Sequence, residues 1–255
     1  MALELITVPC LADNYAYLVH DAESGQTAVV DVPEPGPILA ALEARQWRLT
    51  DILITHHHDD HIQGVDALRA RTGAMVLGAA ADAHRLPRLD LAMDEHSTFS
   101  VGHEFARVID VPGHTLGHIA FHFPESGLAF TADSLMAGGC GRLFEGSARQ
   151  MHASLAKLAA LPPETLICSG HEYTASNLRF AATIEPDNPA LAARIADVSA
   201  LRSKGLPTLP ALLALELATN PYLRSHLPEV KAAVGMAGAD DVSVFAEIRA
   251  RKDRF

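Results

Sequence analysis

Residues 55–61 read Thr55-His56-His57-His58-Asp59-Asp60-His61 and follow directly on the apolar run Ile52–Ile54. This order predicts a strand that ends in a tight loop. Four side chains of the stretch can bind a metal ion and share the spacing His-x-His-x-Asp-His, namely His56, His58, Asp60 and His61. Imidazoles and a carboxylate crowded at one strand end can converge on one point, so the stretch predicts a metal site.

Three more candidate ligands stand alone, each just after an apolar run: His114, Asp133 and His171. In α/β layers, sites collect at the ends of strands, so we expect these three side chains to join the first cluster. Seven ligands exceed the four that one tetrahedral ion takes. Two ions that share one carboxylate would receive four protein ligands each. Imidazole and carboxylate suit zinc, iron or manganese, and the set favours a two-metal hydrolytic site over a closed, Cys-rich structural zinc.

Composition narrows the class of protein. The chain has 255 residues, of which 49% are hydrophobic and 20% charged, as in ordinary globular proteins. Its net charge of −11 argues against a nucleic-acid or anionic-membrane surface. We find no apolar stretch of the ~18–20 residues that span a bilayer, and the first residues do not resemble a secretory signal. The three cysteines are widely spaced, which predicts free buried thiols and a cytoplasmic protein.

Hydrophobic patterns divide the chain near residue 173. Before it, apolar runs predict strands at 3–8, 15–20, 27–31, 51–54, 74–77, 105–111, 119–123, 128–131 and 165–168. Helical spacing occurs at 37–45, 61–72 and 150–160, so this part is predicted to be a layered α/β body. After it, proline-separated segments predict only helices, at 175–184, 190–204, 211–218, 229–233 and 242–251. We therefore expect one domain over residues 1–173 and a helical domain over 174–255.

The ligand pattern and several further stretches together resemble the metallo-β-lactamase superfamily and, within it, glyoxalase II. The stretches are Asp13-Asn14-Tyr15, Gly113-His114-Thr115-x-Gly117-His118, Gly139–Gly146, Gly170-His171-Glu172-Tyr173-Thr174-x-x-Asn177-Leu178 and Arg249-x-x-Lys252-Asp253-x-Phe255. They cover nearly the whole chain, and the last two are typical of glyoxalase II rather than of the superfamily. The resemblance implies a four-layer αββα sandwich followed by a C-terminal α-helical domain that binds glutathione.

The resemblance also implies how the ligands are divided. One metal would be held by His56, His58 and His114. The other would be held by Asp60, His61 and His171, with Asp133 as the bridge and with Asp60 and His61 essential for catalysis. Two divalent ions per chain are implied, with zinc favoured and iron or manganese as alternatives. β-Lactamases of the superfamily often place a cysteine among the second metal's ligands, and none aligns here.

On the substrate side, the resemblance implies that Arg249 and Lys252 bind the glycine carboxylate of glutathione and that Tyr173 and Asn177 add hydrogen bonds. Without it, the basic run at 249–254 would be read as a solvated helix face. Two positions depart from the family pattern, because Arg142 and Phe144 stand where a lysine and a tyrosine are common. Arg142 keeps the charge, whereas Phe144 loses a phenol and its hydrogen bond. The Asp31-Val32-Pro33 turn also differs from the usual Asp-Pro-Gly.

The implied reaction is hydrolysis of S-D-lactoylglutathione, and of related S-2-hydroxyacylglutathiones, to the hydroxyacid and glutathione in methylglyoxal detoxification. Water activated at the binuclear site would attack the thioester, in a protein that acts as a monomer on a small-molecule substrate. The main alternatives are other enzymes of the superfamily: a persulfide dioxygenase, a lactonase or a different thioesterase. A metal-binding or redox-sensing module without catalysis is the alternative from another class.

Overall fold

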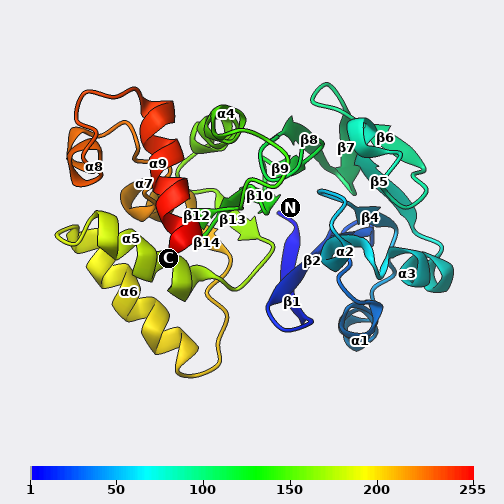
Figure 1. Cartoon of the computed structure of the whole chain (residues 1–255). Helices are drawn as coiled ribbons and strands as arrows, with labels where there is room; N and C mark the ends of the chain where they lie inside the picture. Colours follow the sequence, from blue (N-terminus) through cyan, green and yellow to red (C-terminus); the bar gives the residue numbers. More distant parts are fainter. Residues whose placement is uncertain (1) are drawn as a thin grey trace.

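The computed structural model describes residues 2–255 as two six-stranded sheets with helices on their outer faces. Figure 1 shows the first sheet with α1 and α3 at the right, and the C-terminal helices α5 to α9 at the left. Among residues 2–255, we find no helix long and apolar enough to cross a membrane.

The first sheet has its strands in chain order. They are β1 (Glu4–Cys10), β2 (Asn14–His20), β3 (Thr27–Val30), β4 (Asp51–Leu53), β5 (Met75–Ala79) and β6 (Leu91–Met93). The first three pair antiparallel, and β3 to β6 pair parallel. The helices of this half are α1 (Pro35–Arg45), α2 (Asp59–Ile62) and α3 (Val65–Thr72), and a 3-10 turn covers Ala80–Asp82. The parallel strands β3 and β4 therefore deliver their following loops to the same edge of the sheet.

The second sheet mixes strands that are far apart in the sequence. Its order is β14 (Ala211–Leu212), β13 (Leu166–Ser169), β10 (Leu128–Ala132), β9 (Ile119–Phe123), β8 (Glu104–Asp110) and β7 (Thr98–Val101). Strands β10 and β13 run parallel, so the loops after them also share one edge. A short hairpin, β11 (Leu135–Met136) and β12 (Gly139–Cys140), follows β10 and precedes α4 (Ala148–Ala159).

The last third of the chain is helical apart from β14. It contains α5 (Thr174–Ile184), α6 (Pro189–Arg202), α7 (Leu213–Thr219), α8 (Pro228–Ala233) and α9 (Asp241–Arg254).

Three hydrophobic cores account for the layers. Side chains such as Tyr17 and Phe130 fill the space between the two sheets. Alternate residues of the same strands point outward: Leu18 of β2 packs with Ile38 of α1. On the outer face of the second sheet, Ile167 packs in one cluster with Phe245 of α9. Both faces of each sheet are thus buried, which explains why β2, β9 and β10 are buried throughout and mostly apolar rather than alternating. The expected αββα sandwich with C-terminal helices is confirmed.

Strands β6, β7, β11 and β12 were not predicted from the sequence, and two predicted helices differ in the structure. The helix expected over 61–72 is broken at Gly64, where a Cβ would lie 2.8 Å from Cγ1 of Val32. The segment 211–218, expected to be all helix, begins as strand β14, which pairs antiparallel with β13 before α7 starts. The helical part therefore supplies the edge of the second sheet, and the domain division at residue 173 stays a prediction.

Candidate metal centre

The structure brings the seven candidate ligands together at one edge of the two sheets. His56 and His58 follow β4, whereas Asp60 and His61 lie in α2. The other three come from loops of the second sheet: His114 lies between β8 and β9, Asp133 directly follows β10, and His171 follows β13. Residues more than 100 positions apart thus meet because the strands that precede them end at the same edge.

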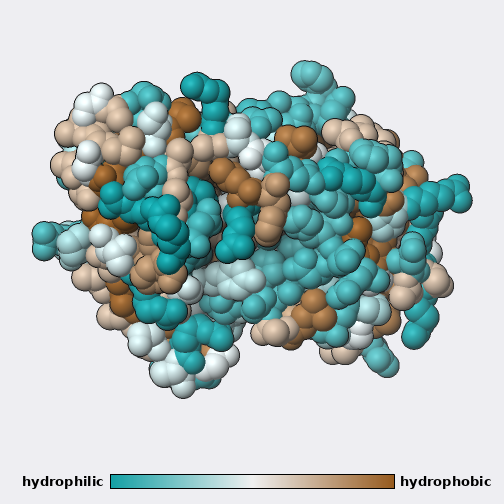
Figure 2. Space-filling view, viewed as in Figure 1, coloured by the Kyte–Doolittle hydropathy of each residue, from teal (hydrophilic) through white to brown (hydrophobic). Residues whose placement is uncertain are grey.

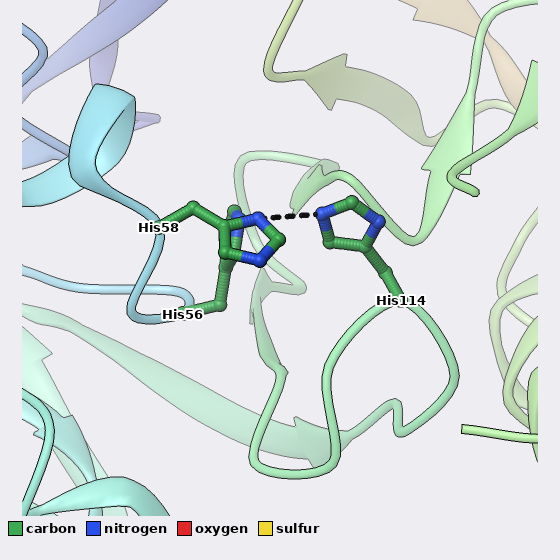
Figure 3. Close-up of side chains that lie close together, drawn as sticks. All are labelled: His56, His58 and His114. Atoms are coloured by element: carbon green, nitrogen blue, oxygen red, sulfur yellow. Dashed lines mark hydrogen bonds between the residues drawn. The ribbon is translucent and has the colours of Figure 1, made fainter. Parts of the chain in front are cut away.

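The first cluster consists of three imidazoles. His56, His58 and His114 offer ring nitrogens that all lie within 4.8 Å of one another. Figure 3 shows the three rings turned toward a common point, with His114 approaching from the opposite side to His56 and His58. Nε2 of His114 lies 2.9 Å from Nδ1 of His58, and Nδ1 of His114 donates to the carbonyl of Arg142 at 2.8 Å.

The second cluster contains a carboxylate and two imidazoles, those of Asp60, His61 and His171. Nε2 of His61 lies 3.3 Å from Nε2 of His171, and Oδ2 of Asp60 lies 3.4 Å from the same His171 nitrogen. The side-chain amide of Asn14 donates to Oδ2 of Asp60 at 3.0 Å, and Nδ1 of His171 donates to Asp13 at 2.9 Å. The contact with Asp13 leaves Nε2 of His171 facing the cluster, whereas Asn14 binds the same Asp60 oxygen that lies near His171.

The carboxylate of Asp133 lies between the two clusters. Its Oδ2 is 3.4 Å from Nε2 of His114 and 3.4 Å from Nε2 of His171, while Oδ1 is 3.5 Å from Nε2 of His61. Gly170 makes room for this position, because a Cβ there would lie 2.6 Å from Oδ1 of Asp133 and 2.7 Å from Cε1 of His61. One carboxylate can therefore reach an ion in either cluster.

The side chains fit two metal ions. Nε2 of His56 and Oδ1 of Asp133 are buried without a hydrogen-bond partner, although buried polar atoms almost always have one. Two nitrogens bound at ~2.0–2.1 Å to a tetrahedral zinc lie ~3.3 Å apart, and the nitrogen pairs of the two clusters lie 2.9 Å and 3.3 Å apart. The two clusters therefore support a binuclear metal site.

Electrostatics differ between the clusters. Burial lowers the pKa of His56, and the neighbouring imidazoles lower it further. Burial also lowers the pKa of His114 despite the nearby charge of Asp133. In the second cluster, burial would lower the pKa of His171, but hydrogen bonds to Asp133 and Asp13 and the charges of Asp133 and Asp60 outweigh it and raise the value to about 9. The surroundings of His171 therefore favour a positive charge at the second cluster.

Two histidines beside the ligands have other contacts. His57 points away from both clusters, as expected, and its Nδ1 lies 3.2 Å from Asp82 while Nε2 lies 3.5 Å from Glu145. His118 is buried, stacks on His56 with 4.6 Å between ring centroids, and accepts the backbone N–H of Asp133 at 3.3 Å. Its expected role as a packing residue beside the ligands matches this position.

A cleft of roughly 510 Å³ opens over the two clusters. It is lined by His58, Asp60, His114, Asp133 and His171, and by all six side chains expected to bind substrate: Arg142, Phe144, Tyr173, Asn177, Arg249 and Lys252. Figure 2 shows the middle of this face as a hollowed, largely hydrophilic band between the helical part at the left and the layers at the right. Hence the helical third of the chain forms one wall of the cleft.

The six side chains differ in exposure and in how far their polar groups are already hydrogen-bonded within the protein. Arg249 is 7% exposed and donates to the carbonyl of Cys140 and to Asp253. Asn177 is also buried and donates to the carbonyl of Ala137 at 3.1 Å. By contrast, the side chain of Arg142 is 61% exposed and its nearest carboxylate is 3.7 Å away. The freest cationic groups in the cleft therefore belong to Arg142 and Lys252.

Lys252 and Tyr173 border the cleft from the two ends of the helical part. Nζ of Lys252 lies 3.3 Å from the carbonyl of Ser176 and near the rings of Phe180 and Phe255. Burial lowers its pKa, as do nearby arginines. The ring of Tyr173 stacks on His171, with centroids 4.7 Å apart and an interplanar angle of 6°.

Four further residues near the clusters have contacts that were not predicted from the sequence: Asp13, Asn14, Arg85 and Glu145. Arg85 bridges Asp82 and Glu145, and Glu145 accepts the backbone N–H of Leu116 at 2.8 Å near His114. Asp13 precedes strand β2 and Asn14 begins it, so both lie at a strand end as the candidate ligands do, and this placement could have marked them. The glutamate and arginine carry no such local signal, since 60 residues separate them.

Family models and known proteins match this chain along almost its whole length. A family model described as Metallo-beta-lactamase superfamily matches residues 13–171, and one described as Hydroxyacylglutathione hydrolase C-terminus matches residues 172–255. Proteins named Hydroxyacylglutathione hydrolase from Cereibacter sphaeroides and Ruegeria pomeroyi are 66% and 59% identical to this chain. Each match covers 100% of both chains.

Solved structures share the fold. The B3 metallo-beta-lactamase BLEG-1 superposes with a TM-score of 0.67 at 19% identity, over 86% of this chain and 99% of that one. ETHE1 from Myxococcus xanthus gives a TM-score of 0.66 at 25% identity, over 98% of this chain and 90% of that one. These matches confirm the fold, and the full-length relatives confirm the resemblance. The chain belongs to the metallo-β-lactamase superfamily and, within it, to the hydroxyacylglutathione hydrolase (glyoxalase II) family.

Proposed function

We propose that this protein hydrolyses the thioester of S-D-lactoylglutathione, and of related S-2-hydroxyacylglutathiones, to the hydroxyacid and glutathione. One observation carries the proposal: a single cleft joins both ligand clusters to the exposed Arg142 and the half-buried Lys252. A thioester carbonyl can lie over the clusters while the carboxylates of the glutathione moiety reach the cations. Relatives that share 66% of the sequence carry the name of this activity.

For the metal ions, we propose that His56, His58 and His114 hold one and that Asp60, His61 and His171 hold the other, with Asp133 shared. The closeness of ring nitrogens and carboxylate oxygens within each cluster supports this division. Zinc is our first choice and iron or manganese the alternatives, since no thiolate lies among the ligands. TTHA1623, a solved protein 29% identical over 66% of this chain, is described as di-iron-bound. When bound, the ions would supply an activated water and Lewis acidity toward the carbonyl.

The protein's own residues have three tasks in this mechanism. Asp60 and His61 would hold the second ion, and the Asn14 amide orients the Asp60 carboxylate. Phe144 lies over the first cluster, with its ring centroid 5.6 Å from that of His58 and 5.3 Å from that of His114. Its apolar ring shields that side of the cleft from water.

The third task is to bind the leaving group. A glutathione thiol has a pKa of about 8.5–9, so it leaves as a thiolate without a strong general acid. Lys252 and Arg142 would bind its carboxylates, and Tyr173 would add a hydrogen bond. Arg249 would act through Asp253 and the Cys140 carbonyl, which it holds in place. We therefore propose that residues 1–173 carry the metal centre and that 174–255 supply most of the glutathione site.

We infer that the enzyme works in the cytoplasm as a monomer. Its cysteines, Cys10, Cys140 and Cys168, are free and buried, as expected, and free thiols and glutathione thioesters fit a reducing compartment. Each residue proposed for the metal centre and the substrate site comes from one chain.

Steady-state kinetics test the function. The metal-replete enzyme should hydrolyse S-D-lactoylglutathione rapidly and a matched lactoyl thioester without the glutathione carboxylates poorly. Equal turnover of both would point to a different thioesterase of the superfamily. Failure with both, in protein shown to carry two metals, would refute the thioester hydrolase.

A further inference from the structure

The hairpin of β11 and β12 is held by side chains of the helical part. Each of its residues from 136 to 140 gives one backbone group to such a side chain, and Figure 1 shows β12 close to α7 and α9. In chain order, the contacts are Met136 carbonyl to Asn220 Nδ2 at 3.2 Å, Ala137 carbonyl to Asn177 Nδ2 at 3.1 Å, Gly138 N–H to Glu216 Oε2 at 2.8 Å, Gly139 carbonyl to Asn220 Nδ2 at 2.9 Å, and Cys140 carbonyl to Arg249 Nη1 at 3.0 Å.

Glu216 is the fully buried acidic residue among these side chains. Its Oε1 accepts Nη2 of Arg194 in α6, and its Oε2 accepts the N–H of Gly138. The Asn220 amide, which follows α7, donates to the same Oε2 at 3.0 Å. The carboxylate therefore bonds to a neighbouring helix with one oxygen and to the hairpin with the other.

The ion pair of Arg194 and Glu216 is buried on both sides, with side-chain exposures of 2% and 0%. Such a pair adds little net stability, because the loss of hydration offsets the attraction of the charges. Arg194 also donates to the hydroxyl of Thr219 at 2.7 Å, so the guanidinium is fixed from a second direction. The pair is thus better explained by the geometry that it imposes on Oε2 than by stability of the helical part.

The position of the hairpin matters to the cleft on its other side. Met136, Cys140 and Arg142 line the cleft, and Arg142 stands two residues after β12. The Cys140 carbonyl accepts a hydrogen bond from Arg249, so a shift of the hairpin moves Arg142 and Arg249 relative to each other. Two cations that bind the carboxylates of one ligand must keep a fixed separation.

We propose that Glu216 is a positioning residue for the glutathione site: through the N–H of Gly138 it sets the place of the β11–β12 hairpin, and with it the spacing of Arg142 and Arg249. The inference rests on the function proposed above. It gives the buried polar core of the helical part a task beyond the side chains that line the cleft.

Glu216→Gln separates this role from two others. A glutamine has one side-chain oxygen, and the charged Arg194 keeps it, so the amide NH₂ faces the Gly138 N–H and displaces the hairpin. Loss of a negative charge by itself would strengthen binding of an anionic ligand, so weaker binding identifies displacement rather than charge. Thr219→Val removes an acceptor of Arg194 but leaves the Gly138 contact, and it is the control for loosening of the ion pair.

The experiment is a calorimetric titration of the metal-replete full-length protein with S-methylglutathione, which keeps both carboxylates and has no thioester. One lost hydrogen bond to a charged group corresponds to ~10–100-fold in affinity, so E216Q should raise Kd by at least ~10-fold. T219V should change Kd less than ~3-fold. Metal content and kcat for a lactoyl thioester without the glutathione carboxylates should match the wild type in both variants.

Two results would overturn the proposal: an unchanged or lower Kd in folded E216Q, or an equal rise of Kd in T219V. Should E216Q fail to fold, Asn220→Ala removes the donor to the Met136 and Gly139 carbonyls and tests the same hairpin. An unchanged Kd in N220A would then refute the positioning role. The titration needs no turnover, so the predicted Kd changes without hydrolysis of S-D-lactoylglutathione would refute the proposed function alone.

Discussion

Gly170 packs against the carboxylate of Asp133 so closely that a Cβ at this position would lie 2.6 Å from Oδ1. The same methyl group would lie 2.7 Å from Cε1 of His61, a ring that is fully buried. The residue before His171 is therefore constrained by two other candidate ligands.

We expect Gly170→Ala to displace the Asp133 carboxylate and the His61 ring together. Because misplacement of reacting groups by ~1 Å can cost ~100-fold in rate, kcat should fall by at least about that factor. The metal content, measured by elemental analysis after dialysis, should fall below two ions per chain. Gly36→Ala, where a Cβ meets no atom within 4 Å, is the matched control and should behave as wild type.

Asp60→Ala should remove the carboxylate from the second cluster. With only His61, His171 and the shared Asp133 left, we expect one metal ion per chain instead of two and a loss of turnover of at least ~100-fold. Elemental analysis and kinetics on the same sample give both numbers. Asp59→Ala changes the exposed neighbouring aspartate and should keep both ions. Near-normal rates in a variant that lacks the second ion would contradict its role.

Lys252→Met should weaken binding of the glutathione moiety while leaving the metal centre intact. A hydrogen bond to a charged group is worth ~1.5–3 kcal/mol, so KM for the glutathione thioester should rise ~10–100-fold with little change in kcat. KM for a thioester without the carboxylates should not change. The exposed Lys204 offers a control, Lys204→Met, for loss of one positive charge.

Phe144→Tyr should restore the phenol that is common in the family at this position. The ring is 60% exposed at the cleft, so a hydroxyl fits without repacking. One added hydrogen bond of ~0.5–1.5 kcal/mol lowers KM by ~2–10-fold. Phe105→Tyr, on the exposed face of β8, adds the same group elsewhere and should leave KM alone. An unchanged KM in Phe144→Tyr would mean that the substrate does not reach this ring.

Glu145 provides a prediction about pH. Hydrogen bonds from Arg85, with a further one from the Leu116 N–H, lower the pKa of Glu145 from 4.5 to about 2 despite partial burial. A carboxyl whose pKa is lower in the folded state stabilises the fold above its unfolded pKa and loses this effect as pH falls toward its folded pKa. Glu145→Gln should therefore lower the free energy of unfolding at pH 7.

The difference between Glu145→Gln and wild type should shrink as pH falls from 4.5 toward about 2. Urea unfolding of both proteins between pH 7 and pH 3 measures it. Glu164→Gln, at an exposed position, should show no such trend. A difference that stays constant with pH would mean that Glu145 acts by packing rather than by charge.

The sequence predicted the layers and the ligands for physical reasons that act locally. Buried strands are mostly apolar, and a ligand such as Asp133 directly follows one, so both leave a signal within a few residues. The left-handed conformation of Asp31 and its hydrogen bonds to Thr55 leave none, because they depend on contacts across 24 residues. Short strands such as β11 and β12, two residues each, are too brief for an alternating pattern to show.

The substrate-side residues were identified through the family resemblance. Which of them keep side-chain groups free to bind a substrate could not be predicted from the sequence. Arg249 and Arg142 look alike in sequence, yet one is buried against the Cys140 carbonyl and the other is mostly exposed. Which arginine keeps free donors depends on how α9 packs on the β11–β12 hairpin. That packing is long-range, since 109 residues separate Arg249 from Cys140.

Strand β14 gives the chain a particular order of assembly. It is the outer neighbour of β13, so the second sheet gains its last strand only after residues 211 and 212 have been synthesised. The pairing involves Leu166 and Ile167, at the end of β13 away from His171. During translation, the N-terminal two-thirds must therefore wait with an open sheet edge along β13. A nascent chain released before residue 212 would expose this edge to other strands.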